Sequence, residues 1–394
     1  MRYYLIAGEA SGDLHGSNLI KGLRAEDPEA EFRLWGGDLM LAAAGDAKDG
    51  VPVLARHYKD GAVMGLGDVL AKAGKLLSNV SDCKNDILAW QPDVVILIDY
   101  PGFNMKIAKF CHGKGIRVFY YIAPKTWASR AGRNRKLRRW VDRLFIVFPF
   151  EIPYFEKAGV PFTYKGNPLV DAILQSPAMN CSREDFFSAH ALEDGKYIAI
   201  LAGSRKGEIS RMMPVCMETA STLMQEERFH DYRFIIAGAP ARSEEDYLKY
   251  MEAMPEGRVS LVFGDTYGVL RHAEAAVINS GTASLEAALI GTPQVVCWST
   301  GAFSAFVARK IFHVLDHVKY ISLGNLCVDR LVFKEFIQED FSTANVSDEL
   351  HRLVEDKDYR ECMMAGYTDI WTSLGGPGAS REVAKSMITI LNNQ

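Results

Sequence analysis

The chain of 394 residues carries a formal net charge of −4, and 24% of its residues are charged. This length accommodates two domains of about 100–200 residues each, and the nearly balanced charge excludes a global electrostatic attraction to nucleic acid. The seven cysteines occur singly, without a Cys-x-x-Cys pair, which predicts reduced thiols in a cytoplasm. No apolar run approaches the ~18 residues of a membrane span, and the one at residues 1–7 is shorter than a signal-peptide core, so we expect a soluble or peripheral protein.

A strand, a glycine-containing loop and a helix are predicted at the amino terminus. Residues 3–7 form an apolar run that leads into Gly8, Gly12 and Gly16. The N–H groups at such a helix start can bind an anion. The spacing differs from the dinucleotide-binding G-x-G-x-x-G, and the alternative is that the glycines only let the helix pack closely on the strand.

Residues 60–79 predict an amphipathic helix. Val63, Leu66, Leu70, Ala73 and Leu77 form an apolar stripe at three- and four-residue steps, Met64, Val69 and Leu76 flank it, and Lys72 and Lys75 lie on the other side. One interpretation is a helix that faces the core. The other is a surface helix that contacts acyl chains or a membrane, where lysines beside an apolar face favour anionic headgroups.

An unbroken apolar run at residues 94–98 predicts a strand that is covered on both faces, as in the centre of a parallel sheet. Asp99 follows at the carboxyl end of this strand, before the turn signal Pro101-Gly102. Ligands bind at that edge in open α/β sheets. Asp99 is therefore either a catalytic base or the N-cap of the next helix.

A further strand at residues 118–122 precedes a basic segment at residues 130–143. Arg130, Arg133, Arg135, Lys136, Arg138, Arg139 and Arg143 lie in it, with Lys125 just upstream. Such a run is usually a solvated helix face, and its density also suits phosphate or anionic lipid. A nucleic-acid interface is less favoured because interleaved aromatic residues and a recognisable binding module are lacking.

The turn-forming residues Gly166-Asn167-Pro168 separate the two halves of the chain, and the second half repeats the same pattern. A strand at residues 197–201 leads into a loop that contains Gly203, Ser204 and Arg205. Amides at a helix start together with an arginine suit a diphosphate. The loop lacks the Gly-Lys-Ser/Thr of a P-loop, which argues against ATP hydrolysis. The alternative is that Arg205 is a surface residue after a tight turn.

A strand at residues 275–279 ends at the helix start Ser280-Gly281-Thr282, and Glu286 follows one turn later on the same face. Hydroxyl and amide groups at this helix start suit a phosphate. A carboxylate one turn deeper suits the two hydroxyls of a ribose. The pattern predicts a sugar-nucleotide pocket.

Six motifs, taken together and in order, resemble the lipid-A-disaccharide synthase family. They are Glu9-Ala10-Ser11-Gly12-Asp13, Ile98-Asp99-x-Pro-x-Phe103-Asn104, Trp127, Gly203-Ser204-Arg205 with Glu208, Ser280-Gly281-Thr282-Ala283 with Glu286, and Ser322-Leu323-x-Asn325-Leu326. The resemblance implies an α/β GT-B fold, in which two Rossmann-like domains with parallel sheets face a central cleft. Residues 1–166, joined by a carboxyl-terminal helix at about 375–394, would form the acceptor- and membrane-facing domain, and residues 167–374 would bind the UDP-sugar donor.

The resemblance also assigns roles to individual residues. Asp99 falls at the position of the family's proposed general base. The positions that bind UDP or the donor correspond to Gly203, Ser204, Arg205, Glu208, Asn279, Ser280, Gly281, Thr282, Glu286 and Asn325. The acceptor-side positions correspond to Glu9, Ser11, Gly12, Asp13, Asn104 and Trp127, and the membrane-associating patch to Val63, Met64, Leu66, Val69, Leu70, Leu76 and Leu77.

Two positions depart from the family pattern. Gly102 stands where the family usually has Asp, so a proton relay through a second carboxylate is absent from this chain. Ser129 stands where the family often has a second Trp, which leaves the acyl or sugar contacts of that loop open.

The activity that the resemblance implies is an inverting glycosyl transfer in lipid A biosynthesis. Asp99 would take a proton from the 6-hydroxyl of 2,3-diacylglucosamine 1-phosphate as this oxygen attacks the anomeric carbon of UDP-2,3-diacylglucosamine. The products would be the β-1,6-linked disaccharide 1-phosphate and UDP. The family works at the cytoplasmic face of the inner membrane of Gram-negative bacteria. The expected partners are thus these two lipid substrates, that membrane surface and a second copy that exchanges carboxyl-terminal segments.

No metal or other cofactor is expected. Asp356-Lys357-Asp358 falls in a polar late helix, and His313 and His317 lack the Glu of a zinc motif. Two other classes stay open at this point. An epimerase or another GT-B transferase would share the second half, and a non-catalytic protein that binds nucleotide and docks on a membrane would not need Asp99.

Overall fold

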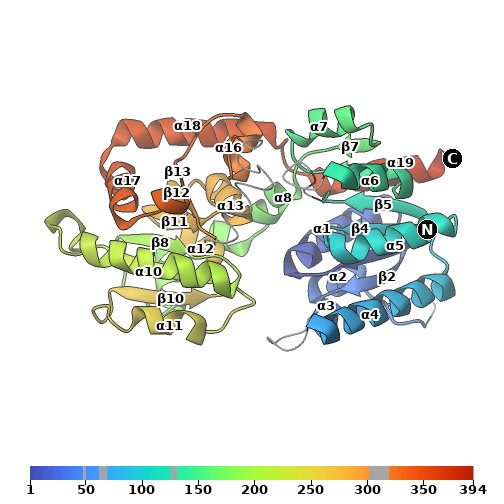
Figure 1. Cartoon of the computed structure of the whole chain (residues 1–394), viewed down its shortest axis with the longest axis horizontal. Coiled ribbons are helices and arrows are strands. Elements are labelled where there is room, and N and C mark those ends of the chain that lie inside the picture. Colours follow the sequence, from blue (N-terminus) through green and yellow to red (C-terminus); the bar gives the residue numbers. More distant parts are fainter. Residues whose placement is uncertain (48–49, 62–68, 125, 127–130, 301–318, 394) are drawn as a thin grey trace. The chain divides into compact units, whose positions relative to one another are not determined.

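The computed structural model describes residues 1–47, 50–61, 69–124, 126, 131–300 and 319–393. The chain divides into two compact units (Figure 1). Met1–Ala172 and Leu374–Gln394 form the first unit, and Ile173–Ser373 forms the second.

The first unit is built on a parallel sheet of seven strands in the order β3-β2-β1-β4-β5-β6-β7. The strands are β1 (Arg2–Ala7), β2 (Glu31–Gly36), β3 (Leu54–His57), β4 (Val94–Ile98), β5 (Arg117–Tyr121), β6 (Arg143–Ile146) and β7 (Phe162–Tyr164). All five residues of β4 are fully buried, which confirms the predicted central strand. The strand order reverses between β1 and β4, and the carboxyl ends of these two strands form the switch point where such folds bind ligands.

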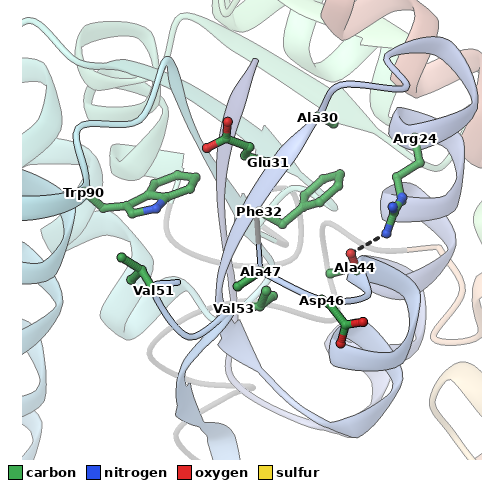
Figure 2. A pocket seen from close by; sticks show the side chains of 10 residues that line it. All are labelled: Arg24, Ala30, Glu31, Phe32, Ala44, Asp46, Ala47, Val51, Val53 and Trp90. Carbon is green, nitrogen blue, oxygen red and sulfur yellow. Dashed lines mark hydrogen bonds between the residues drawn. The ribbon is translucent and has the colours of Figure 1, made fainter. Parts of the chain in front are cut away.

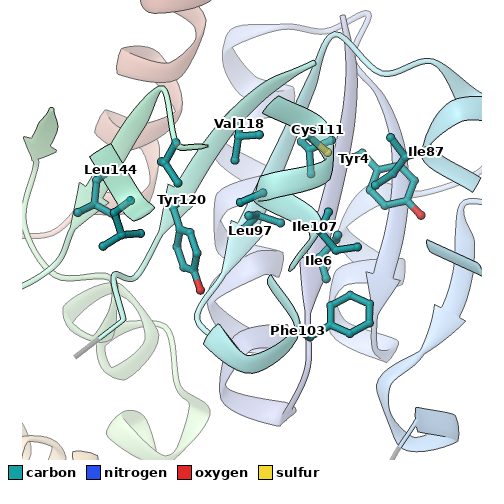
Figure 3. Close-up of a cluster of buried hydrophobic side chains, with 14 of the residues drawn as sticks. Tyr4, Ile6, Ile87, Leu97, Phe103, Ile107, Cys111, Val118, Tyr120 and Leu144 are labelled. Atoms are coloured by element: carbon teal, nitrogen blue, oxygen red, sulfur yellow. The ribbon is translucent and has the colours of Figure 1, made fainter. Parts of the chain in front are cut away.

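Helices cover both faces of this sheet. They are α1 (Ala10–Glu26), α2 (Asp38–Ala44), α3 (Tyr58–Gly61), α4 (Val69–Trp90), α5 (Pro101–Gly113), α6 (Asn134–Trp140), α7 (Glu151–Ala158), α8 (Pro168–Leu174), which ends just inside the second unit, and α19 (Ala379–Asn392). On one face, Ile107 and Cys111 of α5 pack with Ile6 and Leu97 of the sheet (Figure 3). Burial of such side chains contributes about 1.5–3 kcal/mol each.

The carboxyl-terminal helix α19 belongs to the first unit and packs on α1. At Gly22 of α1 an added Cβ would lie 3.1 Å from the Ala384 Cβ, so the glycine permits a close approach of the two helices. The Asp171 carboxylate accepts hydrogen bonds from the N–H groups of Gly378 and Ser380, which fixes the start of α19.

The amphipathic stretch at residues 60–79 is described only in part. Val63, Met64 and Leu66 lie outside the described residues, and α4 begins at Val69. The side chains of Val69, Leu70 and Leu76 also lie outside the described part. Leu77 is 60% exposed, whereas Val80, Cys83 and Ile87 further along α4 face the core. Leu77 is therefore not a core residue, and a membrane-contacting role for this patch stays a prediction.

The basic segment forms a short 3₁₀ turn (Ala131–Arg133) and α6. Leu137 is buried, whereas Arg135, Lys136, Arg138 and Arg139 are exposed. This arrangement is the solvated helix face that the charge run predicts.

The second unit repeats the architecture with a parallel sheet in the order β10-β9-β8-β11-β12-β13. Its strands are β8 (Tyr197–Leu201), β9 (Arg233–Gly238), β10 (Val259–Phe263), β11 (Ala275–Asn279), β12 (Gln294–Trp298) and β13 (Glu335–Ile337). Its helices are α9 (Arg183–Ala189), α10 (Lys206–Leu223), α11 (Glu245–Met251), α12 (Thr266–Arg271), α13 (Thr282–Ile290), α16 (Leu323–Val328), α17 (Thr343–Glu355) and α18 (Lys357–Ser373). The order reverses between β8 and β11, which defines a second switch point.

Candidate functional site

The two loops at the first switch point contact each other through an aromatic ring. A Cβ added to Gly8, directly after β1, would lie 2.3 Å from the ring of Tyr100, the second residue after β4. The Tyr100 ring also stacks on Phe103 with centroids 5.4 Å apart, and Phe103 stacks on Trp35 at 5.6 Å. Only a glycine at position 8 leaves room for this packing.

Asp99 lies on a strained turn at the carboxyl end of β4. Asp99 and Tyr100 have φ angles of 43° and 46°, a left-handed conformation that costs about 1–3 kcal/mol at a non-glycine residue. The Asp99 side chain is half-buried. Tyr100 is the N-cap of α5, so the alternative in which Asp99 caps this helix is wrong.

Asn104 holds the backbone of this turn. Its side chain is fully buried, and its Nδ2 donates hydrogen bonds to the carbonyl oxygens of Asp99 at 2.8 Å and of Ile98 at 3.2 Å. The hydroxyl of Tyr120 donates to the same Asp99 oxygen at 2.5 Å. The structure thus gives Asn104 a role in shaping the turn, and it identifies Tyr120, which the motifs do not contain.

The amino-terminal motif divides into an exposed part and a buried part. Glu9 and Ser11 are exposed, and the Ser11 hydroxyl donates to Glu9 at 3.0 Å. Gly12 packs on β1, where an added Cβ would lie 3.2 Å from the Cβ of Ala7. The Asp13 carboxylate is 3% exposed and accepts hydrogen bonds from N–H groups at the start of α2. These donors are Gly37 at 2.8 Å, Leu39 at 3.1 Å and Met40 at 3.1 Å. Trp127 lies outside the described residues.

At the second switch point, Glu208 organises the loop after β8. Its carboxylate accepts hydrogen bonds from the N–H groups of Ser204 at 3.0 Å and Arg205 at 3.2 Å. It also pairs with the Arg205 guanidinium at 2.6 Å, although 81% of the Arg205 side chain is exposed. Gly203 has a φ of +102°, and an added Cβ would lie within 3 Å of both Glu208 and Asn279. The two loop amides are therefore occupied, and the exposed guanidinium is the group that a ligand can reach.

The start of α13 offers N–H groups instead. Gly281 is the N-cap and has no side chain that could cap the helix, so among the described residues the first amides of α13 have neither an intrahelical acceptor nor one from the N-cap side chain. Thr282 is exposed beside them, and the Ser280 hydroxyl donates to the carbonyl oxygen of Ile321 at 3.2 Å. Such a helix start attracts anions because the N–H dipoles point toward the ligand.

Glu286 lies one turn further along α13 and is half-buried. Burial raises its pKa to about 7, and a hydrogen bond from the Tyr267 hydroxyl at 3.3 Å opposes this rise. Burial and the neighbouring Glu286 raise the pKa of Tyr267 well above its usual value, so this hydroxyl remains a donor. Asn279, at the end of β11, is buried, and its Oδ1 has no hydrogen-bond partner among the described residues.

Asn325 is fully buried, and its side chain forms hydrogen bonds with other residues of the second unit. Its Oδ1 accepts from the N–H of Val332 at 2.8 Å, and its Nδ2 donates to the Phe333 carbonyl at 3.0 Å and to Glu335 at 2.8 Å. Glu335 also accepts from the N–H groups of Ile321 at 2.8 Å and Ser322 at 3.0 Å. This network fixes the segment to which Ser280 is bonded. Glu335 belongs to no recognisable motif, so sequence reasoning does not identify it.

A small pocket in the first unit lies away from the switch point of that unit's sheet (Figure 2). It has a volume of about 20 Å³, which is room for roughly one water molecule. Glu31 and Phe32 at the start of β2 and Trp90 at the end of α4 line it, so it lies near the amino ends of the strands. The Arg24 side chain donates to the Ala44 carbonyl beside it. This pocket is too small for a sugar nucleotide.

Within the described ranges, no three His, Cys, Asp or Glu residues are grouped so that they could hold a metal ion. Asp356 caps the start of α18 by accepting from the Tyr359 N–H at 2.9 Å. His313 and His317 lie outside the described residues.

The fold is the GT-B architecture of two Rossmann-like units. Each unit has Rossmann-type strand order with polar groups at the switch point, and solved structures with this architecture include sugar-nucleotide epimerases and glycosyltransferases. A Staphylococcus aureus MnaA–UDP structure matches with a TM-score of 0.70 and 13% identity, over 99% of this chain and 97% of that one. The calicheamicin glycosyltransferase CalG4 matches with a TM-score of 0.57 and 14% identity, over 100% and 98%. The predicted GT-B fold is confirmed.

The sequence comparisons are more specific. The family model for lipid-A-disaccharide synthetase matches residues 3–382. Lipid-A-disaccharide synthases from Geobacter metallireducens and Geobacter sulfurreducens are 36% and 35% identical, each over 100% of this chain and 98% of theirs. The chain belongs to the lipid-A-disaccharide synthase family. It is a hexosyltransferase of lipid A biosynthesis that uses a UDP-sugar and lipid substrates, and the epimerase and non-catalytic alternatives are set aside. Among the helices of the described residues, none has the length and apolar character needed to span a membrane.

Proposed function

We propose that the enzyme transfers 2,3-diacylglucosamine from UDP-2,3-diacylglucosamine to the 6-hydroxyl of 2,3-diacylglucosamine 1-phosphate. The observation that carries this proposal is the chemistry of the two switch points. The first presents a half-buried carboxylate, Asp99, on a rigid turn. The second presents an exposed guanidinium, Arg205, and the uncapped helix start at Gly281. A carboxylate suits an acceptor hydroxyl, and the cationic groups suit a diphosphate.

Asp99 is the general base in the proposed mechanism. It takes the proton of the acceptor 6-hydroxyl while this oxygen forms a bond to the anomeric carbon of the donor. The bond from that carbon to the UDP oxygen breaks, and the anomeric configuration inverts to give the β-1,6 linkage. General-base catalysis of this kind contributes about 10²- to 10⁴-fold.

The second unit stabilises the leaving group. The amides at the start of α13 and the hydroxyl of Thr282 bind the diphosphate, while Glu286 accepts hydrogen bonds from the ribose hydroxyls. Arg205 exchanges its ion pair with Glu208 for the more highly charged diphosphate. Charge that develops on the departing UDP is thereby stabilised by groups already in place, without a metal ion.

The remaining donor-side residues hold the loops of the donor site in place. Glu208 holds the amides of the Ser204 loop, and Asn325 with Glu335 holds the segment that bonds to Ser280. Gly203 and Asn279 pack at the same edge of the sheet. We assign these residues to the shape of the donor site. Gly12, Asp13 and Asn104 have the equivalent task on the acceptor side, where Glu9 and Ser11 are exposed for contact with substrate.

The acyl chains direct the enzyme to a lipid surface. We propose peripheral association with the cytoplasmic face of the inner membrane of a Gram-negative bacterium through the patch of residues 63–77, to which the exposed Leu77 belongs. Within one chain, α19 packs on α1. A dimer that exchanges carboxyl-terminal segments would form the same contact between two copies.

The test is UDP release from the two proposed substrates in the presence of EDTA, for the wild type and for Asp99→Ala. We expect wild-type activity to survive EDTA and the variant to lose at least ~10²-fold in kcat. Unchanged activity in Asp99→Ala would remove Asp99 from the chemistry. Loss of wild-type activity in EDTA that Mg²⁺ restores would contradict the metal-independent mechanism.

A further inference from the structure

Tyr120 combines complete burial with a polar contact at the candidate active site. The residue lies in β5, next to β4 in the sheet, and its side chain is fully buried. Its ring extends so that the hydroxyl is directed toward the connection between β4 and α5 (Figure 3). The hydroxyl donates to the carbonyl oxygen of Asp99 at 2.5 Å.

The hydrogen bond from Tyr120 is accepted by a backbone in a strained conformation. Asp99 and Tyr100 are consecutive non-glycine residues with positive φ, a conformation that persists only where the surroundings over-determine it. The Asp99 carbonyl accepts two hydrogen bonds, one from Tyr120 and one from Asn104. Two donors on one oxygen fix the orientation of the peptide between Asp99 and Tyr100, because a carbonyl has two lone pairs.

The same peptide sets the direction of the Asp99 side chain. The Asp99 N–H donates to the carbonyl of Tyr121 at 3.1 Å, so the residue is held on its amino side by β5 and on its carboxyl side by Tyr120 and Asn104. Rotation of either peptide would swing the carboxylate. A displacement of about 1 Å of a reacting group can cost on the order of 10²-fold in rate.

The Tyr120 hydroxyl keeps its proton across the working pH range. Burial, followed by the charge of Asp99, raises the pKa of Tyr120 well above its usual value, and Asn104 and Arg133 oppose this rise only in part. The hydroxyl therefore acts as a permanent hydrogen-bond donor. It is not a proton carrier for the reaction, and its contribution must be geometric.

We propose that Tyr120 is a positioning residue for glycosyl transfer, which holds the strained turn at Asp99 so that the carboxylate points at the acceptor hydroxyl. The inference rests on the proposed role of Asp99 as general base. Because its side chain is fully buried, we expect Tyr120 to contact no substrate and to act through the backbone of Asp99.

The experiment is a double-mutant cycle of Tyr120→Phe and Asp99→Asn, with UDP release as the assay. The Phe ring preserves the packing and removes only the hydroxyl. We expect Tyr120→Phe to lower kcat about 10- to 100-fold while the KM values of both substrates change less than twofold. In the Asp99→Asn background we expect no further loss, because the carboxylate that Tyr120 orients is absent.

Tyr197→Phe is the matched control. Tyr197 is also fully buried in a central strand, and its hydroxyl donates to a backbone carbonyl, that of Val269, at 2.8 Å. It lies at the start of β8, at the end opposite to the switch point, so we expect kcat to remain unchanged. An equal loss of kcat in Tyr120→Phe and Tyr197→Phe would show a general effect on folding and overturn the proposal.

The remaining outcomes separate this inference from the proposed function. Equal losses from Tyr120→Phe in the wild-type and Asp99→Asn backgrounds would show that Tyr120 acts independently of Asp99, and the inference would be wrong while the base assignment stands. Full activity of Asp99→Asn would refute the base assignment itself. Full activity of Tyr120→Phe alone would show that Asn104 suffices to hold the turn, which also overturns the inference.

Discussion

At the carboxyl end of β4, Asp99 is held on a strained turn by hydrogen bonds to its backbone, whereas at the carboxyl end of β8, Arg205 extends into solvent and pairs with Glu208. Both positions border the switch point of their own sheet, although β4 lies on the later-strand side of the reversal and β8, like β1, on the first-strand side. The difference matches the tasks that we propose. A base must be fixed before the substrate arrives, while a group that binds an anion can exchange an internal partner for the ligand.

Of the substitutions in the second unit, replacement of Arg205 should have the largest effect on activity. We expect Arg205→Ala to lower kcat about 10²- to 10³-fold, because the cation that stabilises the negative charge of the leaving diphosphate is removed. UDP affinity, measured by calorimetry, should fall in parallel. Lys206→Ala is the matched control, since Lys206 is the next residue, is also exposed, and pairs with Asp246 at 3.3 Å. Similar losses in both variants would mean that only the local charge matters.

Removal of a buried amide should affect stability. Asn325→Ala leaves the Val332 N–H without its acceptor, which costs about 1–3 kcal/mol. We expect thermal unfolding of the second unit to shift down by several degrees, with a loss of UDP affinity that disappears when binding is measured well below the transition. Asn345→Ala, which removes a bond to the Asp340 carbonyl at an exposed site, is the control and should shift the transition by less than one degree. If UDP affinity stays low in fully folded Asn325→Ala, the amide contacts the nucleotide directly.

Glu286 should make UDP binding depend on pH. With a pKa of about 7, its ionised fraction rises from roughly one-tenth at pH 6 to nine-tenths at pH 8, so affinity for the ribose should increase about tenfold over this range. The folded-state pKa is above the ordinary value of 4.5, so the stability of the second unit should fall as the pH rises from 4.5 to about 7. Glu286→Gln should flatten both profiles. A UDP affinity that is independent of pH in the wild type would contradict this role for Glu286.

The strands and their terminal loops could be predicted because apolar runs and glycine positions are local signals. Residues 94–98 and 275–279 are buried strands as expected, and both lead into candidate site loops. The direction of a polar side chain is different, because it depends on groups brought together by the fold. The motif residues Asp13, Asn104 and Asn325 hold backbone N–H or carbonyl groups from within the protein.

The residues that sequence reasoning missed all lie outside the recognised motifs. Tyr120 lies within an apolar run that predicts only a core strand, and Glu335 and Tyr267 follow no motif. A tyrosine in a buried strand did carry a signal, because a buried hydroxyl needs a hydrogen-bond partner. The sequence does not show that this partner is the Asp99 carbonyl, since β4 and β5 must pair in register before the two groups meet.

The smallest expected effect concerns Gly102, in the first turn of α5, where the family usually has Asp. An added Cβ would meet no atom within 4 Å, so the structure accommodates a side chain there. We expect Gly102→Asp to stabilise the first unit by about 0.3–1 kcal/mol, because a negative charge lies near the helix N-terminus. Gly113→Asp, at the other end of the same helix and equally unobstructed, should lower the melting temperature instead. Since Tyr120 and Asn104 already orient Asp99, kcat of Gly102→Asp should stay within about threefold of the wild type. A tenfold rise in kcat would show that a second carboxylate can relay the proton, and the fixed turn at Asp99 would then be only part of what the acceptor side requires.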